Sequence, residues 1–349
     1  MAEKLGDPVR LIHALRGLWG ITYVAGDWPR AQELVNRARI AIRRTRDPVA
    51  LTVGHLMSGV TRFYRGELVA ARSALEEALG CYDPGGHRAH ILASGMDNGV
   101  HVLNHLALVR WTLGFPEASL RTAQRALDRA RELAHPVSTG LALHFACHVR
   151  ELRREWDAAA RLAEELMALG VRHGLAHFRA WAATQSGAAL IGRGELAAGI
   201  ADLQRGVAEL RGAGDEAWRP FYDALLAGAL AGLGRTEDAS AVLEETIAMA
   251  GAGQHVHEAE IHRVAGELFL AAGRAADAEA RLVQALAVAR AQQARSFELR
   301  VATSLARLWA QRGERRRGRE LLDPVCGWFA EGLDTPDMRQ AQQLLEALS

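Results

Sequence analysis

The chain has 349 residues, of which 49% are hydrophobic and 24% are charged. This is more sequence than one compact core usually organises, which favours an array of small units that pack only on their neighbours. The 42 Lys and Arg residues nearly balance the 41 Asp and Glu residues, and the formal net charge is +1. No overall electric field attracts nucleic acid or an anionic membrane, so we expect neither as a partner.

The three cysteines exclude a disulfide framework. Cys81, Cys147 and Cys326 are widely separated and odd in number, and they form no Cys-x-x-Cys metal motif. Residues 1–8 lack the basic and apolar parts of a signal peptide, and no run of about 18 apolar residues occurs. These features predict a cytoplasmic protein in a reducing compartment.

The first predicted element is a helix that begins at Pro8, after the capping residue Asp7. Proline at the first helical position and an aspartate before it are typical of a helix start. The same signal recurs at Pro48, which follows Asp47, and the proline recurs without the aspartate at Pro136. Each of the three prolines lies 18 residues before a turn position, which is Gly26 for the first helix. We therefore expect a repeating unit of helix, turn and second helix.

The turn position recurs along nearly the whole chain. Successive turn positions are 40, 48, 40, 40, 40, 39 and 40 residues apart, and a glycine in the turn allows the positive φ that ends a helix. The eight turn positions are Gly26, Gly66, Gly114, Arg154, Gly194, Gly234, Gly273 and Gly313.

Small residues flank these turns at fixed distances. Seven positions before and five positions after the turn, the residue is small in nearly every unit, as in Gly187 and Gly199 around Gly194. Two antiparallel helices need small residues where their backbones cross closely. Nine and thirteen positions after the turn, apolar residues such as Leu203 and Val207 form the buried stripe of the second helix.

Two places depart from the period. Between the second and third units, the segment from Tyr82 to His87 contains Pro84, Gly85 and Gly86, which predicts an inserted loop. After the eighth unit, Thr335 and Pro336 start another helix, and we expect residues 336–348 to cap the last exposed edge.

The fold class predicted from this pattern is all-α. We expect a right-handed α-α superhelix, a solenoid of about eight helix pairs plus the capping helix, with residues 1–349 as a single repeat domain. Glycine turns between small residues resemble the tetratricopeptide repeat, including the aromatic residue two positions after the turn in Trp28 and Trp156. The units are longer than the ~34 residues of that family.

Four segments carry a narrower resemblance. They are residues 5–8 (LGDP), 218–226 (WRPFYDALL), 298–309 (ELRVATSLARLW) and 327–335 (GWFAEGLDT). The chain resembles the carboxy-terminal repeat region of large bacterial signalling proteins in which a class III adenylate/guanylate cyclase or kinase domain precedes a signal-transduction ATPase. This resemblance implies a regulatory repeat module whose catalytic domains lie upstream in relatives.

No catalytic motif accompanies the repeats. Lys4 is the only lysine and lies outside any Gly-x-x-x-x-Gly-Lys-Ser/Thr sequence, so a phosphate-binding P-loop is excluded. No Gly-x-Ser-x-Gly elbow occurs. We predict a protein without its own catalytic centre and without a cofactor.

One spacing permits a metal site. His144, His148 and Glu151 share a helical face at i, i+4 and i+7, and such side chains can ligate a divalent ion. The alternative is that they are a polar lining of the solenoid's inner surface. A sequence with 14 histidines produces such pairs easily, so the lining is favoured.

The inner surface is the predicted binding site. The first helix of each pair lines the concave side of such a superhelix, so positions 13, 10, 6, 3 and 2 before each turn should face the groove. The selected residues are His13, Arg16, Tyr23, Phe63, Tyr64, His101, Asn104, Trp111, His144, His148, Glu151, Trp181, Thr184, Phe221, Glu260, Arg263, Glu267, Arg300 and Arg307.

These residues suggest capture of a protein or peptide. Aromatic side chains supply anchors, and Arg and Glu residues fix the register of a bound segment. For each aromatic residue, packing between neighbouring units is an alternative role. A repeat domain that senses a small molecule and changes its curvature is the second hypothesis, and a metal-dependent enzyme built on the His144 face is the third.

Overall fold

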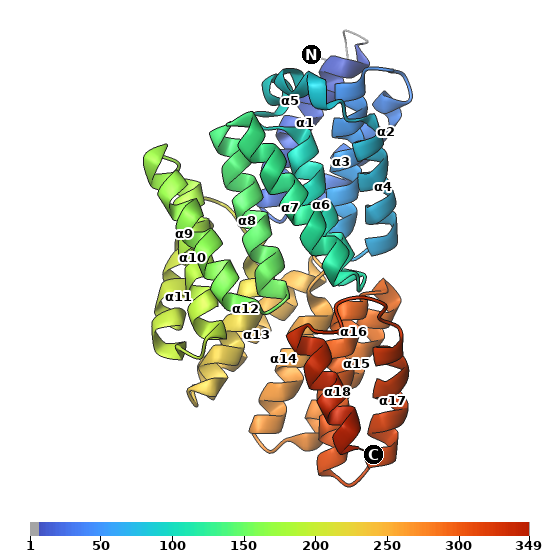
Figure 1. Ribbon diagram of the computed structural model, residues 1–349, viewed down its shortest axis with the longest axis vertical. Helices are drawn as coiled ribbons and strands as arrows, with labels where there is room; N and C mark the ends of the chain where they lie inside the picture. Colours follow the sequence, from blue (N-terminus) through green and yellow to red (C-terminus); the bar gives the residue numbers. More distant parts are fainter. Residues whose placement is uncertain (1–6, 349) are drawn as a thin grey trace.

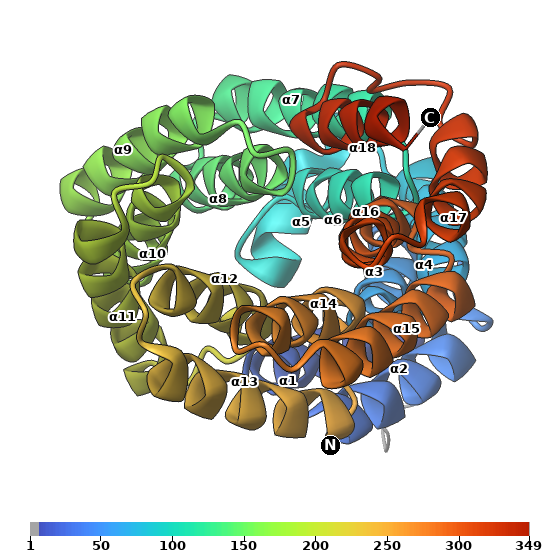
Figure 2. The ribbon, with the colours of Figure 1, turned by 90° about the horizontal axis from the view of Figure 1, so that it is seen from below.

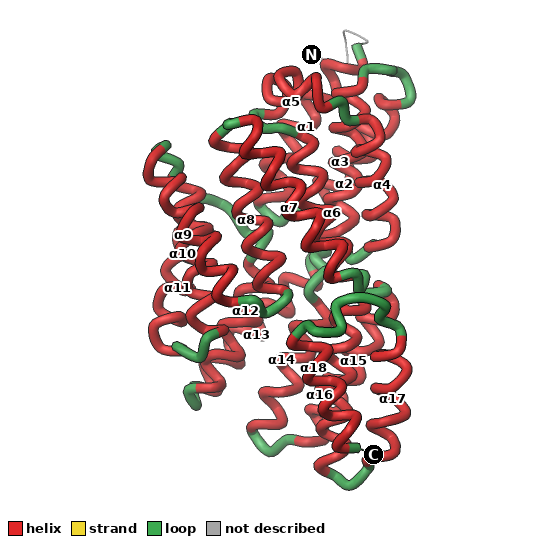
Figure 3. The backbone as a smooth tube through the Cα atoms, viewed as in Figure 1, coloured by secondary structure: helices red, strands yellow, loops and turns green. Residues whose placement is uncertain are grey.

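The computed structural model describes residues 7–348, and every regular element in this range is helical. Figure 3 shows helices joined by short turns, with no strand in the described part of the chain. None of the helices within residues 7–348 is both long and apolar enough to cross a membrane.

The helices form eight antiparallel pairs and a final single helix (Figure 1). The amino-terminal pairs are α1 (Pro8–Val24) with α2 (Trp28–Ile42), α3 (Pro48–Tyr64) with α4 (Leu68–Cys81), α6 (Asn98–Thr112) with α7 (Pro116–Leu133), and α8 (Pro136–Leu152) with α9 (Trp156–Arg172). The remaining elements are α10 (Ala176–Gly192) with α11 (Leu196–Gly212), α12 (Arg219–Gly232) with α13 (Thr236–Gly251), α14 (Glu258–Ala271) with α15 (Ala275–Gln292), α16 (Arg295–Gln311) with α17 (Arg315–Gly327), and α18 (Pro336–Ala347).

Local chemistry explains where the pairs start and turn. The Asp7 carboxylate accepts hydrogen bonds from the backbone N–H groups of Val9 (2.9 Å) and Arg10 (3.2 Å) at the start of α1. All eight turn positions have positive φ, from 56° at Arg154 to 91° at Gly114. Glycine adopts this conformation without steric cost, whereas Arg154 does so at some cost in backbone energy.

Small residues bring the paired helices into close contact. Gly187 of α10 and Gly199 of α11 face each other, and a Cβ atom on Gly187 would collide with the backbone of Leu203. A collision with backbone cannot be relieved by a side-chain rotation. Small side chains seven positions before and five after the turn are therefore a requirement of the crossing.

The insertion between the second and third pairs contains more structure than the loop predicted from its sequence. Pro84–Gly86 forms a short 3-10 helix, η2, and α5 (His87–Ser94) follows it. The Asp83 carboxylate accepts a hydrogen bond from the Gly85 N–H group (2.9 Å) and initiates this turn. His90 of α5 is buried, and α5 contacts α1, α3 and α6, which explains why the segment is ordered as a helix.

The pairs are arranged as a ring. In Figure 2 the first helices of the pairs, such as α6, α8, α10, α12, α14 and α16, lie on the inside, and the second helices lie on the outside. In Figure 1 the pairs from α12 onward lie below the amino-terminal pairs, so the chain completes one superhelical turn and begins another.

The second superhelical turn is hydrogen-bonded to the first. The carbonyl oxygen of Val24, the last residue of α1, accepts from the N–H group of Glu216 just before α12 (2.9 Å). The carbonyl oxygen of Tyr64, the last residue of α3, accepts from the N–H groups of His255 (2.9 Å) and Val256 (3.1 Å) just before α14. Each pair of the first turn therefore meets the pair five units later.

Contacts between the two superhelical turns continue at the third and fourth pairs, both of which meet α16. The Ser296 hydroxyl of α16 donates to the carbonyl oxygen of Trp111 in α6 (2.5 Å). The Arg300 guanidinium of α16 donates to the carbonyl oxygen of Leu152, the last residue of α8 (2.6 Å). We call this contact surface, between the carboxyl ends of α1, α3, α6 and α8 and the starts of α12, α14, α16 and α18, the seam.

The segment between α17 and α18 extends the seam to the outer helices. The Trp328 ring packs edge-on against Phe115, with 5.5 Å between ring centroids. The Glu331 carboxylate accepts a hydrogen bond from the N–H group of Ala118 in the first turn of α7 (2.9 Å). A carboxylate at this position also interacts favourably with the helix dipole of α7.

The turn geometry predicts opposite effects of two glycine substitutions. Gly194 has a φ of 87° and Gly17 lies inside α1, and a Cβ atom at either position would meet no neighbour within 4 Å. Gly194→Ala should lower the free energy of unfolding by about 1 kcal/mol, because only the backbone conformation is penalised. Gly17→Ala should raise it by up to about 1 kcal/mol, since alanine favours the helix.

The measurement is the thermal unfolding midpoint followed by circular dichroism at 222 nm for both variants and the parent chain. Equal shifts of the same sign for the two variants would contradict the assignment of Gly194 to a turn that requires positive φ.

Candidate functional site

Most residues of the predicted groove lie in the interior of the molecule. The second superhelical turn and neighbouring units cover them, and none of the buried group is more than 8% exposed. This group is Arg16, Phe63, Tyr64, His101, Asn104, Trp111, His144, His148, Glu151, Trp181, Thr184, Phe221, Glu260, Arg263 and Arg300. The remaining four, His13, Tyr23, Glu267 and Arg307, are half-buried.

Aromatic and histidine rings fill the inside of the ring. His144 stacks on Trp181 with 4.0 Å between ring centroids. His148 packs edge-on against Trp218 (4.7 Å) and Phe221 (4.4 Å), both from the amino-terminal end of the α12 segment. The rings that the sequence suggests as anchors for a partner therefore pack against one another across the seam in this structure.

The proposed metal ligands do not converge. His148 Nδ1 lies 2.8 Å from Glu151 Oε2, and the Tyr222 hydroxyl donates to the same oxygen (3.3 Å). The His144 ring instead faces Trp181. Within residues 7–348 no group of three or more His, Cys, Asp or Glu side chains is arranged to hold a metal ion. The hypothesis of a metal site at His144, His148 and Glu151 is thus not supported by the geometry.

Burial determines the protonation states of His148 and Glu151. Burial lowers the pKa of His148 to about 3. Burial also raises the pKa of Glu151 to about 8, although the hydrogen bond from Tyr222 opposes the change. Burial therefore favours the neutral form of both side chains, an imidazole and a protonated carboxyl group.

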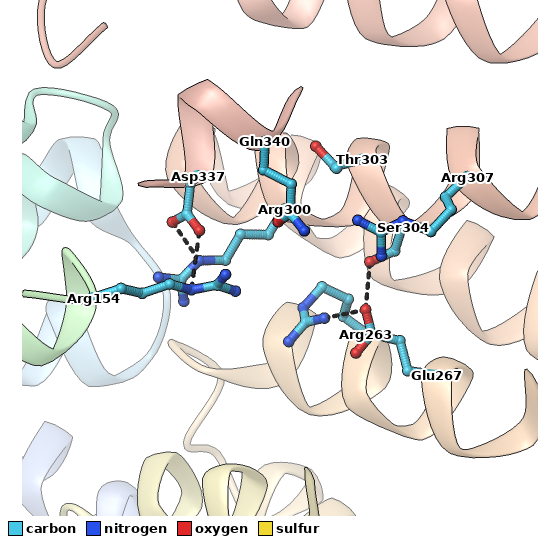
Figure 4. A pocket seen from close by; sticks show the side chains of 9 residues that line it. All are labelled: Arg154, Arg263, Glu267, Arg300, Thr303, Ser304, Arg307, Asp337 and Gln340. Atoms are coloured by element: carbon cyan, nitrogen blue, oxygen red, sulfur yellow. Dashed lines mark hydrogen bonds and ion pairs between the residues drawn. The ribbon is translucent and has the colours of Figure 1, made fainter. Parts of the chain in front are cut away.

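The accessible part of the inner surface is a cleft at the seam. It consists of two adjoining cavities of about 340 Å³ and about 210 Å³. The larger cavity has an apolar wall that includes Phe221, Leu225 and Val264, from α12 and α14. The smaller, which we call the arginine pocket, is lined by Arg154, Arg263, Glu267, Arg300, Thr303, Ser304, Arg307, Asp337 and Gln340 (Figure 4). Together they are the seam cleft, and four of the lining residues, Arg154, Arg263, Glu267 and Arg300, belong to both cavities.

Asp337 connects two arginines across the seam. Its carboxylate lies 2.8 Å from Arg300 Nε and 3.1 Å from Arg154 Nε. Figure 4 shows the Asp337 carboxylate in contact with both guanidinium groups, which lie next to each other. The Arg300 guanidinium also lies over the Trp111 ring, 4.9 Å from its centroid, which fixes its plane.

On the other side of the pocket, Arg263 is held by two carboxylates. Its guanidinium contacts Glu260 (2.7 Å) and Glu267 (2.5 Å), and the Ser304 hydroxyl donates to Glu267 (2.8 Å). Burial alone would raise the pKa of Glu260, but the guanidinium groups of Arg263 and Arg300 outweigh it and lower this pKa to about 2. Glu260 therefore stays ionised and neutralises part of the arginine charge.

Arg307 differs from the other arginines of the pocket. It lines the cavity and is half-buried, yet it forms no ion pair or hydrogen bond with any described residue. Figure 4 shows its guanidinium extending toward Ser304. One positive charge of the pocket is thus not compensated by the protein.

The seam cleft unites some predicted residues and adds others. Phe221, Glu151 and the charged set Glu260, Arg263, Glu267, Arg300 and Arg307, all selected by the position rule, line it. Arg154 and Asp337 were not selected. The only sequence signal for Arg154 is that it replaces glycine at a turn, and Asp337 follows Pro336 as an ordinary first-turn residue of α18.

The chain is similar in sequence to part of a longer protein. No protein-family model matches the chain. An uncharacterized protein of Rhizobium meliloti (strain 1021) is 26% identical over 294 residues, which is 83% of this chain. The chain spans only 28% of the length of that relative.

Solved structures show the fold. A Rap protein complexed with Competence and Sporulation Factor matches 97% of both chains with a TM-score of 0.61 at 9% identity. The Rap conjugation gene regulator of plasmid pLS20, in complex with the Phr* peptide, matches with a TM-score of 0.57 at 12% identity over 97% of this chain and 98% of that one. The predicted all-α, tetratricopeptide-like solenoid is confirmed.

The buried histidines predict acid sensitivity. Burial lowers the pKa of each of five histidines, His101, His105, His144, His148 and His257. The unfolded chain therefore binds more protons than the folded chain below the ordinary histidine pKa of about 6.5. Their contribution to the free energy of unfolding is complete above that pH and is lost as the pH falls toward 3. Glu151 acts oppositely, since its stabilising contribution is lost as the pH rises through about 8.

Substitution of one buried histidine tests this. His101→Leu removes one such proton-binding group, and between pH 7.5 and 5.5 its free energy of unfolding should fall by about 1 kcal/mol less than that of the parent chain. His173→Gln, at an exposed position, is the control and should follow the parent. Urea unfolding at the two pH values measures both, and an identical pH dependence in all three proteins would contradict the prediction.

Proposed function

We propose that this chain is a non-catalytic repeat module that binds a peptide or a segment of another protein in the seam cleft. We further propose that residues 1–349 act as one repeat domain, the regulatory or sensor part of a bacterial cyclase- or ATPase-type signalling protein.

The continuity of the seam cleft carries the proposal. An apolar wall containing Phe221, Leu225 and Val264 adjoins the arginine pocket, and shared arginines line both parts. A bound segment can place an apolar side chain against the wall and an acidic group beside the arginines. Such a combination provides both buried apolar area and charge-assisted hydrogen bonds.

The solved structures support a peptide ligand by analogy. Two Rap proteins with the same overall fold are described in complex with a peptide or signalling factor, namely Phr* and Competence and Sporulation Factor. At 9% and 12% identity the likeness concerns the fold. It supports a peptide as the kind of ligand, and the residues of the seam cleft set the chemistry of recognition.

The signalling context rests on two observations. The chain corresponds to 28% of a longer relative, which is expected if the repeats accompany other domains. The segments 218–226, 298–309 and 327–335, which carry the resemblance to cyclase- and ATPase-linked repeat regions, all lie at the seam. A cleft formed where two superhelical turns meet suits a regulatory module, because a ligand bound there contacts both turns.

A small-molecule sensor is the second candidate. The larger cavity, at about 340 Å³, falls in the size range of small-molecule pockets, roughly 300–1,000 Å³. A panel of metabolites tested by thermal shift separates the candidates, because a ligand that binds the folded state raises its unfolding temperature.

Selection from a random peptide library tests the peptide-binding proposal. The parent chain should enrich peptides in which an acidic group adjoins apolar side chains. Leu225→Glu places a charge on the apolar wall and should weaken binding of the enriched peptides by about tenfold or more, because the charge loses water when the peptide covers it.

Val283→Glu is the matched control. Val283 is an exposed apolar residue of α15 outside the seam cleft, and its variant should bind like the parent. Fluorescence anisotropy with a labelled peptide measures all three proteins. Enriched peptides that bind Leu225→Glu as well as the parent would place recognition elsewhere and refute this function for the cleft.

A further inference from the structure

The arginine pocket holds more positive than negative charge. Four guanidinium groups, from Arg154, Arg263, Arg300 and Arg307, line it together with the carboxylates of Glu267 and Asp337. Glu260 of the adjoining cavity also pairs with Arg263 and lies 3.6 Å from Arg300, so one positive charge remains in excess. Thr303, Ser304 and Gln340 contribute only neutral polar groups.

The crowding of these cations affects their ionisation. Asp337 raises the pKa of Arg154, but burial and the neighbouring guanidinium groups of Arg300 and Arg263 outweigh it, so this pKa is lowered from its ordinary value. One carboxylate is thus insufficient to offset the mutual repulsion of the arginines at this end of the pocket. An additional anion would relieve it.

The Asp337 carboxylate contacts two of the guanidinium groups of the pocket. Its two oxygens face Nε of Arg154 and Nε of Arg300, at 3.1 Å and 2.8 Å. The contact with Arg154 is ionic only, since Asp337 Oδ1 is buried and has no hydrogen-bond partner among the described residues. The Asp337 carboxylate therefore leaves part of the hydrogen-bonding capacity of the pocket unused.

Arg307 supplies a second, independent observation. It lines the same pocket, and no described carboxylate or carbonyl oxygen accepts a hydrogen bond from it. A half-buried guanidinium without an anionic partner is available for a ligand at no cost in existing ion pairs.

We propose that the arginine pocket is a binding site for a doubly charged oxyanion, such as the phosphate group of a ligand, and that Asp337 is its intramolecular competitor. The anion competes with the Asp337 carboxylate for Arg154 and Arg300, and Arg307, which lines the opposite side of the same pocket, is the third donor (Figure 4). The cavity of about 210 Å³ accommodates a group of this size. This site overlaps the part of the seam cleft proposed above for the acidic group of a peptide, whereas the apolar wall at Leu225 takes no part in it.

Displacement of Asp337 has a structural consequence. Asp337 is in the first turn of α18, and its ion pairs attach the start of that helix to the turn after α8. Farther along, Met338 and Ala341 remain buried in an apolar cluster that includes Leu322 of α17. Anion binding therefore releases the beginning of α18 from the first superhelical turn while the rest of α18 stays packed.

Titration calorimetry with inorganic phosphate tests the site on the full chain. Ionic strength is held constant with sodium chloride at pH 7.5, so that general screening is the same in every sample. Arg307→Gln removes a charged donor without breaking an ion pair, and should weaken phosphate binding by about tenfold or more. Arg307→Lys, which keeps the charge, should recover part of the loss.

The competitor variant should act in the opposite direction. Asp337→Asn removes the internal carboxylate and should tighten phosphate binding by about tenfold. Arg339→Gln is the control, because Arg339 is an exposed residue two positions along the same helix. Thermal midpoints of all variants verify that each protein is folded under the conditions of the titration.

Succinate at the same ionic strength distinguishes the two sources of a doubly charged oxyanion. Binding of either probe, weakened by Arg307→Gln and strengthened by Asp337→Asn, supports the site and identifies the preferred group as phosphate or paired carboxylates. The proposed anion site is overturned if neither probe binds the Asp337→Asn variant. It is also overturned if neither substitution changes the affinity for a probe. These results leave the peptide test at Leu225 unaffected, so the two proposals fail separately.

Discussion

The structure depends on hydrogen bonds between the carboxyl ends of inner helices and the chain one superhelical turn later. The carbonyl oxygens at the end of a helix have no partner within that helix, and buried ones must find one elsewhere. At Val24 and Tyr64 the partners are the N–H groups of Glu216 and His255, and at Leu152 the partner is Arg300. Each bond is worth only about 1 kcal/mol, but leaving one of these carbonyl groups unpaired costs about as much or more. The register of five units per turn follows from meeting this demand at several helix ends.

Closure of the ring changes the role of the inner surface. In an open solenoid the first helices present their side chains to solvent, whereas here the starts of α12, α14 and α16 lie beneath the ends of α1, α3 and α6. Tyr64 and His144, which face inward as expected, are consequently covered by the Trp218 ring. Access remains at the seam cleft, where charged side chains meet beside a short apolar wall. The contact between the two superhelical turns therefore both buries the histidines and leaves the arginines of the seam cleft accessible.

The repeat was predictable because its causes are local. Small residues at Gly187 and Gly199 and positive φ at Gly194 act within one helix pair, so a fixed sequence spacing records them. Closure of the ring depends on a small rotation between successive helix pairs, which adds up over five units. The spacing of residues in the sequence does not reveal the size of this rotation. The inward direction of the selected residues could be inferred, but not whether they would be buried. For the same reason the contact between Arg154 and Asp337, distant in the sequence, could not be inferred.

Arg154 shows how the repeat pattern and the seam cleft compete at one position. Its φ of 56° costs roughly 1 kcal/mol relative to glycine, the residue at the other seven turn positions. Glycine there would relieve the backbone but remove the only cation that the first superhelical turn contributes to the arginine pocket. The ion pair with Asp337 does not explain why arginine stands at this turn, because Arg300 already binds that carboxylate through Nε. Asp337 Oδ1, which faces Arg154, lacks a hydrogen-bond partner among the described residues. A pocket that needs positive charge from both superhelical turns explains better why arginine replaces glycine here. The proposed anion, which contacts arginines of both turns, creates that need.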